Sequence, residues 1–310
     1  MIVNKGFSPP SIAVLVPCLD EAITIEKVIK DVKLALPKCE IYVYDNDSSD
    51  GTYDIALEHG AHAKRVKCRG KSFVVSRMFA DIDADIYIMI DGDDTYDLEK
   101  ITEMVELVNE QSYDMVVGRR NHTASGAYRP GHVFGNWFLT KTVQILFGQN
   151  LKDMLSGLRV FKRGLVKSFP VQSEGFGLET ELNIHALTLG LAVCEVDIKY
   201  KERPEDSFSK LNTIYDGIKI MRTITRLVFL ERSFFVYSSI AILLSLAGIY
   251  IISPIVFEFL ETGKVPRLPT AIAASFLFLT AVVSMFTGAV LDGVARVRKE
   301  AKLLFYILNS

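Results

Sequence analysis

Three carboxylates follow an apolar, β-prone run of the chain at close spacing. The run is Ile86–Ile90, and Asp91, Asp93 and Asp94 come directly after it, with Gly92 between the first two. Like charges at the end of a buried strand repel one another and are costly to desolvate without a counter-charge. Mg²⁺ supplies such a charge and typically binds between one or two carboxylates and substrate phosphates. An isolated Asp-Gly-Asp is more often a solvated turn, so the rest of the chain decides between the two interpretations.

A second predicted strand, Ile41–Tyr44, also runs into acidic residues, beginning with Asp45. Open α/β sheets bind ligands at the carboxyl ends of their strands, where a carboxylate can accept hydrogen bonds from a ribose or a base. Acidic turns also arise for purely local reasons. Two acidic strand ends on one edge nevertheless favour a nucleotide, with Asp45 at its sugar or base and Asp91 and Asp93 at its diphosphate through a metal.

Four other charged residues are candidates, each with an ordinary alternative. Lys71 begins a predicted helix and could contact a phosphate or be a surface lysine. Position 65 is Arg where a P-loop needs glycine, so the sequence lacks that phosphate cradle. Arg203 and Lys210 flank an acidic loop, where they bind phosphate at a lipid surface or remain solvated. Asp153, taken alone, would be a helix cap.

Strands and helices alternate along the first two thirds of the chain. Apolar runs predict strands at Ser11–Val16 (ended by Pro17), Ile41–Tyr44, Ala63–Val66, Ile86–Ile90, Met115–Val117, Leu158–Phe161 and Ala192–Tyr200. Helical spacing predicts helices at Glu21–Leu36, Thr52–Gly60, Lys71–Ile82, Asp97–Glu110 and Leu178–Leu189. The alternation predicts an α/β fold with a mainly parallel sheet and helices on both faces. His132–Phe147 is helix-like, either in the core or resting on lipid.

Two long uncharged segments lie in the C-terminal third. Phe234–Phe257 and Thr270–Leu291 would each span roughly 33–36 Å as helices, enough for a hydrocarbon core of ~30 Å. The mean hydropathy is +0.25 although 23% of residues are charged, which suits a soluble part joined to a membrane part. The net charge of −2 argues against a general nucleic-acid binder, and the four cysteines lack the spacing of a zinc site.

The expected organisation is a soluble domain over 1–210, an amphipathic juxtamembrane helix over 211–232 and a membrane domain over 233–310. The juxtamembrane helix is basic, as expected at an anionic membrane surface. Basic residues also gather outside both spans: Arg222, Arg226 and Arg232 before the first, and Arg296, Arg298, Lys299 and Lys302 after the second. The positive-inside rule therefore predicts an integral membrane protein whose soluble domain and both termini are cytosolic.

Seven short motifs in a fixed order, followed by the two spans, carry a family resemblance. They are Val16–Glu21, Asp45–Thr52, Gly70-Lys71, Asp91-Gly92-Asp93, Gly118–Arg120, Asp153–Arg159, and Arg203 with Lys210. The chain resembles the polyprenyl-phosphate glycosyltransferases of glycosyltransferase family 2. It is closest to the GtrB-like bactoprenol glucosyltransferases of the bacterial inner membrane and more distant from the dolichol-phosphate mannosyltransferases. The resemblance covers nearly the whole chain and implies a Rossmann-like GT-A domain and possible homo-oligomers.

The resemblance also implies site residues. Those of the nucleotide-sugar site would be Pro17, Leu19, Glu21, Val43, Asp45, Lys71, Asp91, Gly92, Asp93 and Arg120. Asp91 and Asp93 would hold Mg²⁺ or Mn²⁺, and Asp153 would be the proposed catalytic base. Arg203 and Lys210, with Arg120, would bind the diphosphate and the acceptor phosphate.

The chain departs from the family pattern at several positions. Leu19 stands in place of a usual tyrosine, and Asn46 and Asp47 stand in place of Asp and Gly. Ser72 and Asp206 replace glycines. Because Leu19 and Asn46 fall where the nucleobase is read, the resemblance leaves the donor open.

The predicted function is inverting, metal-dependent transfer of one hexose, from UDP-glucose, to undecaprenyl phosphate. GDP-mannose and UDP-N-acetylhexosamine are the alternative donors, and a catalytically inactive membrane scaffold is the alternative of another class. The acceptor is a phosphate monoester whose second pKa is near ~6, so it is already largely a dianion at neutral pH. We therefore hypothesise that Asp153 orients a substrate more than it removes a proton.

Overall fold

The computed structural model describes residues 9–121, 141, 144, 151–171, 177–201, 203–204, 213–265 and 267–310. The predicted site residue Lys210 and most of the helix predicted at His132–Phe147 lie outside this described part. The chain divides into two compact units. The first contains Met1–Ile224 and Lys302–Ser310, and the second contains Thr225–Ala301.

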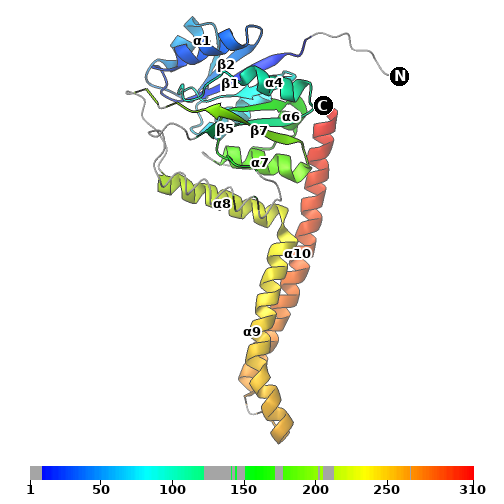
Figure 1. Ribbon diagram of the computed structural model, residues 1–310. Helices are drawn as coiled ribbons and strands as arrows, with labels where there is room; N and C mark the ends of the chain where they lie inside the picture. The colour runs from blue at the N-terminus through cyan, green and yellow to red at the C-terminus, as the bar shows by residue number, and fades with distance from the viewer. Residues whose placement is uncertain are drawn as a thin grey trace, which may run out of the picture. The chain divides into compact units, whose positions relative to one another are not determined.

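A single sheet organises the first unit (Figure 1). Within the described residues it has seven strands in the order β3-β2-β1-β4-β6-β5-β7. The strands are β1 (Ile12–Cys18), β2 (Glu40–Asp45), β3 (His62–Arg65), β4 (Ile86–Met89), β5 (Met115–Asn121), β6 (Arg159–Lys162) and β7 (Val193–Lys199). β6 is antiparallel to β4 and β5, and every other pairing is parallel. The prediction of a mainly parallel sheet is confirmed.

Helices cover both faces of this sheet. α1 (Ile25–Ala35), α2 (Thr52–Glu58) and α4 (Ile101–Asn109) share one hydrophobic core with it, and α3 (Lys71–Asp81), α6 (Arg163–Ser168) and α7 (Leu178–Leu189) share another. α1 illustrates why these helices pack on the sheet. Its buried residues recur at helical spacing and so form one apolar side: Ile25, Val28, Ile29 and Val32. The sheet is thereby buried on both faces, which is why its strands read as continuous apolar runs.

Two of the boundaries that differ from the sequence prediction have a clear physical reason. The prediction that Pro17 ends the first strand is wrong, because β1 continues to Cys18. The ladder to β4 already ends at Leu15, so the missing N–H of Pro17, which faces that side, has no partner to lose. α4 begins at Ile101 rather than Asp97, because the Asp97 N–H donates to the Lys199 carbonyl in a strand-like contact. The short helix α6 was not predicted.

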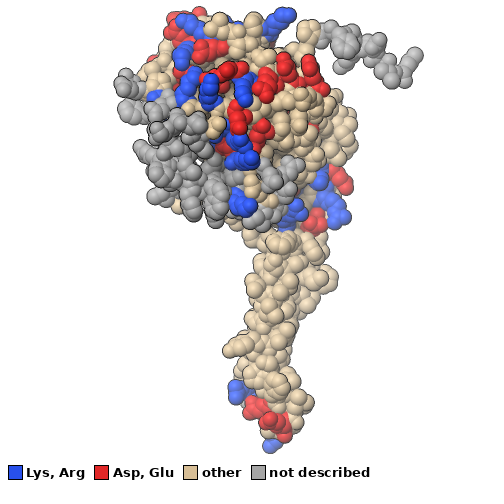
Figure 2. Space-filling model, viewed as in Figure 1, with Lys and Arg blue, Asp and Glu red and all other residues tan. Residues whose placement is uncertain are grey.

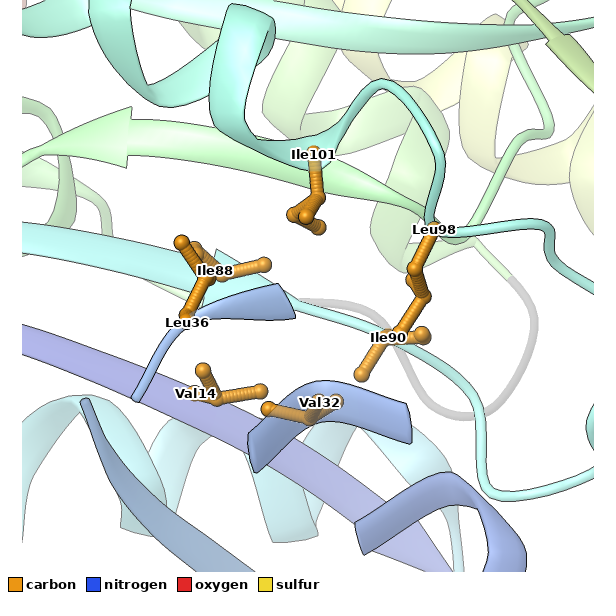
Figure 3. Close-up of a pocket in the computed structure, with 7 residues that line it drawn as sticks. All are labelled: Val14, Val32, Leu36, Ile88, Ile90, Leu98 and Ile101. Atoms are coloured by element: carbon orange, nitrogen blue, oxygen red, sulfur yellow. The ribbon is translucent and has the colours of Figure 1, made fainter. Parts of the chain in front are cut away.

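A small apolar gap lies between the sheet, α1 and the start of α4 (Figure 3). Its lining is entirely aliphatic: Val14, Val32, Leu36, Ile88, Ile90, Leu98 and Ile101. It is too small to hold a water molecule, and its lining has no polar group that could orient a ligand. We interpret this gap as a packing feature of the core and not as a ligand-binding site.

The C-terminal end of the chain packs on the first unit. The Tyr306 hydroxyl donates to Asp114 Oδ1 at 2.5 Å, and the second carboxylate oxygen of Asp114 accepts the Ala192 N–H at 2.8 Å. A Cβ at Gly164 would lie 3.0 Å from the Tyr306 ring, so the absence of a side chain there lets the ring approach α6. The segment Lys302–Ser310 is therefore an integral part of this unit.

The second unit is formed by helices of apolar composition. α9 (Ser233–Thr262) and α10 (Leu268–Leu308) are long and apolar enough to cross a membrane, which confirms the two predicted spans by length and composition. Figure 2 shows their surface almost bare of charged side chains along the spans, with charges at the segment that connects them. α8 (Thr213–Glu231) precedes them and has a pronounced hydrophobic side.

Small residues let α9 and α10 approach closely. The buried residues of α10 are Ala274, Ala281, Gly288 and Ala295, at seven-residue spacing. A Cβ at Gly288 would lie 2.8 Å from Tyr237 Cβ, and one at Gly248 would lie 3.1 Å from the Phe278 ring. Membrane helices associate through small residues of this kind, since lipid removes most of the hydrophobic driving force between them.

Candidate active site

Most of the predicted site residues that the structure describes gather at one edge of the sheet. β1, β2 and β4 run parallel to one another, and β5 runs parallel to β7. β6 lies between these two groups and is antiparallel to both β4 and β5. All five strands therefore point the same way, and their carboxyl ends share this edge. The loop Lys152–Leu158 enters β6 from the same edge, since β6 runs in the opposite direction. Topology therefore places the acidic turn after β4, the end of β5 and the Asp153 segment together.

Lys71 neutralises the first carboxylate of the acidic turn. Its Nζ donates to Asp91 Oδ1 at 2.6 Å and to Glu179 Oε1 at 2.7 Å. Glu179 is only 5% exposed and comes from the first turn of α7. Burial alone would lower the pKa of Lys71, but the two carboxylates raise it above its ordinary value. Lys71 is therefore a charged member of the site and not a surface lysine.

Arg203 neutralises the second carboxylate. Its guanidinium donates to Asp93 Oδ2, while Asp93 Oδ1 accepts the Thr95 hydroxyl at 2.6 Å. Burial and the neighbouring Asp91 raise the pKa of Asp93, as expected for two carboxylates held close together. These two carboxylates therefore form a strongly cation-seeking pair.

Asp94 differs from its two neighbours because it turns towards other cations. It forms ion pairs with Lys27 of α1 and with Lys201, the latter at 3.7 Å. Its backbone is left-handed, with φ of 53°. Aspartate tolerates that conformation because its short side chain can bond locally. Asp94 therefore shapes the turn, while Asp91 and Asp93 face Lys71 and Arg203.

Gly157 brings the Asp153 segment against the acidic turn. Its N–H donates to the Tyr96 hydroxyl at 2.7 Å. A Cβ at this position would overlap the Asp91 carboxylate and lie 2.9 Å from Asp91 Cγ. Burial and Asp91 raise the pKa of Tyr96 well above its ordinary value, so the phenol stays protonated. Only glycine fits here, and its backbone joins the two halves of the site.

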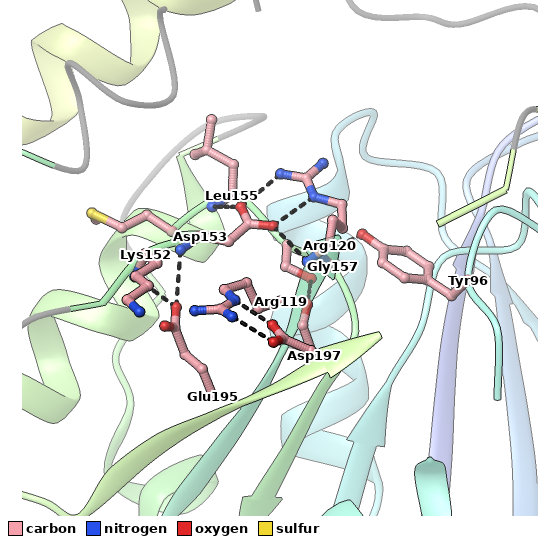
Figure 4. A network of polar contacts seen from close by, with 12 residues as sticks. Tyr96, Arg119, Arg120, Lys152, Asp153, Leu155, Gly157, Glu195 and Asp197 are labelled. Atoms are coloured by element: carbon pink, nitrogen blue, oxygen red, sulfur yellow. Dashed lines mark hydrogen bonds and ion pairs between the residues drawn. The ribbon is translucent and has the colours of Figure 1, made fainter. Parts of the chain in front are cut away.

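Asp153 is held by an arginine. Arg120 Nε donates to Asp153 Oδ2 and Arg120 Nη2 to Asp153 Oδ1, both at 2.7 Å. The Asp153 side chain is 4% exposed, and the Arg120 guanidinium also lies 5.5 Å from the centre of the Tyr200 ring. Such a two-pronged pair fixes orientation and strongly favours the ionised carboxylate. Figure 4 shows this pair within its network.

The loops after β1 and β2 interlock where the nucleoside was predicted to lie. The Asp20 N–H donates to Ser48 Oγ at 2.8 Å and the Glu21 N–H to Thr52 Oγ1 at 2.9 Å. Asp45 is buried and accepts the N–H and hydroxyl of Ser48. Pro17 and Leu19 are half-buried beside these loops, whereas Val43 lies in the core.

Two departures from the family pattern have a structural explanation. Asp47 has φ of 65°, a left-handed conformation that glycine or aspartate can adopt. Asn46 is buried, and its Nδ2 donates to the carbonyls of Val66 at 3.0 Å and Cys68 at 2.7 Å. A carboxylate could not make these two donations. Asn46 therefore holds the segment that leads into Lys71.

The donor set fits a divalent cation that shares its coordination with a substrate. Among the described residues, no group of three or more His, Cys, Asp and Glu side chains could hold a metal. Asp91 and Asp93 supply two hard oxygen ligands at the edge of the sheet. Mg²⁺ and Mn²⁺ accept such a partial set when phosphate oxygens and water complete it. The residues present therefore fit a metal that arrives with a diphosphate.

Comparison with known proteins identifies the family. Residues 13–169 match the family described as Glycosyl transferase family 2. The chain belongs to glycosyltransferase family 2. The predictions of this family and of a glycosyltransferase are confirmed.

Two relatives match most of the chain. Glycosyltransferase AglJ of Haloferax volcanii is 30% identical over 81% of this chain and 83% of its own length. The dolichyl-phosphate hexose transferase of the same organism is 27% identical, covering 71% of this chain and 95% of its own.

The fold also matches a solved structure. Glucosyl-3-phosphoglycerate synthase from Mycobacterium tuberculosis, in complex with Mn²⁺, uridine diphosphate and glucosyl-3-phosphoglycerate, superimposes with a TM-score of 0.58. The match covers 71% of this chain and 79% of that chain at 23% identity. The predicted α/β fold of GT-A type is thereby confirmed.

Replacing Gly157 by alanine is expected to lower kcat of this glycosyltransferase by roughly 10²-fold. The new methyl would displace the Asp91 carboxylate, and misplacing a reacting group by ~1 Å costs about that much. Initial rates at saturating donor and metal measure the effect. Gly293→Ala is the matched control, because a Cβ there meets nothing within 4 Å. A Gly157→Ala rate equal to that of the control would contradict the close approach.

Several site residues escaped the sequence prediction. Glu179, Tyr96 and Glu195 contact Lys71, Gly157 and the backbone of Asp153, respectively. Glu179 had a signal in the sequence, since it is an acidic residue in the first turn of a predicted helix, but nothing in the sequence indicated Lys71 as its partner. Tyr96 and Glu195 had none, because their partners lie far away in the sequence.

Proposed function

We propose that this protein transfers a single hexose from UDP-glucose to undecaprenyl phosphate, with inversion at the anomeric carbon. One observation carries the proposal: the Gly157 backbone lies directly against the Asp91 carboxylate. The acidic turn that suits a metal-bound diphosphate and the segment that bears Asp153 therefore belong to one site. A donor bound at the turn would present its sugar to a nucleophile held near Asp153.

The described residues suggest how the reaction is promoted. Lys71 and Arg203 already lie on Asp91 and Asp93, so they are placed to pair with diphosphate oxygens when a cation takes over the carboxylates. A bound divalent metal would neutralise the charge that develops on the leaving diphosphate. Arg120 and Asp153 would orient the acceptor phosphate for in-line attack from the opposite face. The acceptor dianion needs no strong base, as its second pKa is near ~6.

A membrane-held acceptor agrees with the second unit. α9 and α10 could cross a bilayer, and α8 presents exposed Lys219, Arg222 and Arg226. Basic side chains near a membrane attract anionic headgroups by about 1 kcal/mol each. The relative named as a dolichyl-phosphate hexose transferase supports a polyprenyl phosphate acceptor. We propose that the catalytic unit lies on the cytosolic side, as the flanking basic residues predict.

A donor panel tests the function. Purified full-length protein in lipid would be mixed with undecaprenyl phosphate and radiolabelled UDP-glucose, GDP-mannose or UDP-N-acetylglucosamine, with and without EDTA. We expect label in the lipid fraction from UDP-glucose and its loss with EDTA. Transfer from a different donor would change the proposed donor sugar and leave the proposed reaction unchanged. No transfer from any donor would refute the proposal, and transfer that survives EDTA would refute the metal.

A further inference from the structure

The Asp153 loop, defined as Lys152–Gly157, is pinned at both ends by side-chain acceptors. Tyr96 accepts the N–H of Gly157 at its far end. At its near end, Glu195 Oε1 accepts the N–H of Lys152 at 2.7 Å and the N–H of Asp153 at 2.9 Å. Figure 4 shows the Glu195 side chain reaching from β7 to these two amides. One carboxylate oxygen thus fixes two successive peptide units beside the Asp153 side chain.

The neighbouring carboxylate on the same strand makes a different contact. Asp197 lies two residues further along β7, and both of its oxygens accept from the Arg119 guanidinium. β7 pairs with β5 in parallel register, with Glu195 beside Val117 and Asp197 beside Arg119. Since residues two apart on a strand share one face, the two acids are matched in position and differ in partner. Glu195 alone of the pair contacts the loop.

The contact bears on the Asp153 side chain. Arg120 reaches both oxygens of Asp153 only if the Asp153 backbone stays in place, and the Arg120 N–H also donates to Oδ2 at 3.2 Å. Without an acceptor at Glu195, two backbone donors lose their partner and the start of the loop is released. We propose that Glu195 is a positioning residue, which orients Asp153 towards Arg120 and the acceptor phosphate. This inference rests on the proposed function.

Three substitutions of Glu195 distinguish the effect of where its side-chain oxygen lies from the effect of its negative charge. Glu195→Gln keeps a carbonyl oxygen at the same reach and removes the charge, so we expect kcat within about threefold of wild type. Glu195→Asp keeps the charge and withdraws the oxygen by one methylene, so we expect kcat to fall roughly 10- to 100-fold, as does misplacement of a catalytic group. Glu195→Ala is expected to resemble Glu195→Asp.

The donor side supplies the second measurement. The contacts of Lys71 with Asp91 and Glu179 do not involve Glu195, so KM for the nucleotide-sugar is expected to stay within about threefold in all three variants. Asp197→Ala is the matched control, with kcat within about threefold of wild type. Thermal unfolding of each variant checks that the loss of kcat is not a loss of folded protein.

The outcomes distinguish two failures. Glu195→Gln as impaired as Glu195→Asp would overturn the inference, because charge and not position would then matter. Glu195→Ala as active as Asp197→Ala would also overturn it. A parallel rise in donor KM would show general disruption of the site and would count against positioning. Absence of transfer in the wild-type protein would overturn the proposed function and this inference with it.

Discussion

Asp91→Asn and Asp93→Asn are each expected to lower kcat/KM for sugar transfer by roughly 10²- to 10⁴-fold. A metal ion that stabilises the charge on a leaving diphosphate is worth several kcal/mol, and each ~1.4 kcal/mol is a factor of ten in rate. Removing one carboxylate also takes a counter-charge from a cation of the site, since Arg203 bonds Asp93 and Lys71 bonds Asp91. We expect the half-activating Mn²⁺ concentration to rise in both variants, measured from initial rates across a metal titration.

Asp94→Asn is the matched control for this experiment. It makes the same chemical change in the same turn, and asparagine also tolerates the left-handed backbone that this position requires. Because Asp94 pairs with Lys27 and Lys201, its loss should cost at most a few-fold in kcat/KM and leave the metal titration unchanged. Equal losses in all three variants would show that the turn needs negative charge in general and would remove the specific metal role of Asp91 and Asp93.

The parts of the fold that follow from periodic burial were predictable. α7 was predicted to span Leu178–Leu189, which is where it lies, because an apolar helical run there ends at Gly190 in a left-handed conformation. β5 proved longer than the predicted Met115–Val117, extending to Asn121. Its last residues are polar, and only their pairing with β7 makes them a strand. Local sequence cannot reveal a strand that depends on a partner far along the chain.

The candidate site divides in the same way. Asp91 and Lys71 could be singled out because each stands at the end of a strand or the start of a helix, where ligands bind. Glu179 lies 108 residues from Lys71, and their contact arises only when α7 packs against the sheet. Asn46 was expected near the nucleobase, and the structure adds that its amide donates to two carbonyls of its own chain, which the sequence did not indicate. The partner of a polar residue depends on tertiary packing, which motif spacing does not encode.

Asp153→Asn is expected to lower kcat by roughly 10- to 100-fold at every pH. Asparagine keeps one oxygen for Arg120 and turns an NH₂ group towards the other guanidinium donor, so the two-pronged contact is lost. The Arg120 side chain is only 10% exposed, so the loss of its counter-charge is expected to disturb the geometry around the acceptor. Stability should fall as well, so the melting temperature of the variant must be measured beside its rate.

The pH dependence of that variant distinguishes orientation from proton removal. If the acceptor dianion is the nucleophile, the rate falls as pH drops through the second pKa of the phosphate, near ~6. That acidic limb belongs to the substrate, so Asp153→Asn should retain it unchanged beneath a uniformly lower rate. An acceptor phosphonate, whose second ionisation lies at higher pH, should move the acidic limb to higher pH in wild type and variant alike.

If Asp153 were the base, the acidic limb would report the ionisation of Asp153. The limb would then disappear in the Asp153→Asn variant, and it would not shift when the phosphonate replaces the phosphate acceptor. The Arg120 contact favours the first outcome, because a carboxylate that already accepts from two guanidinium donors is a poor proton acceptor.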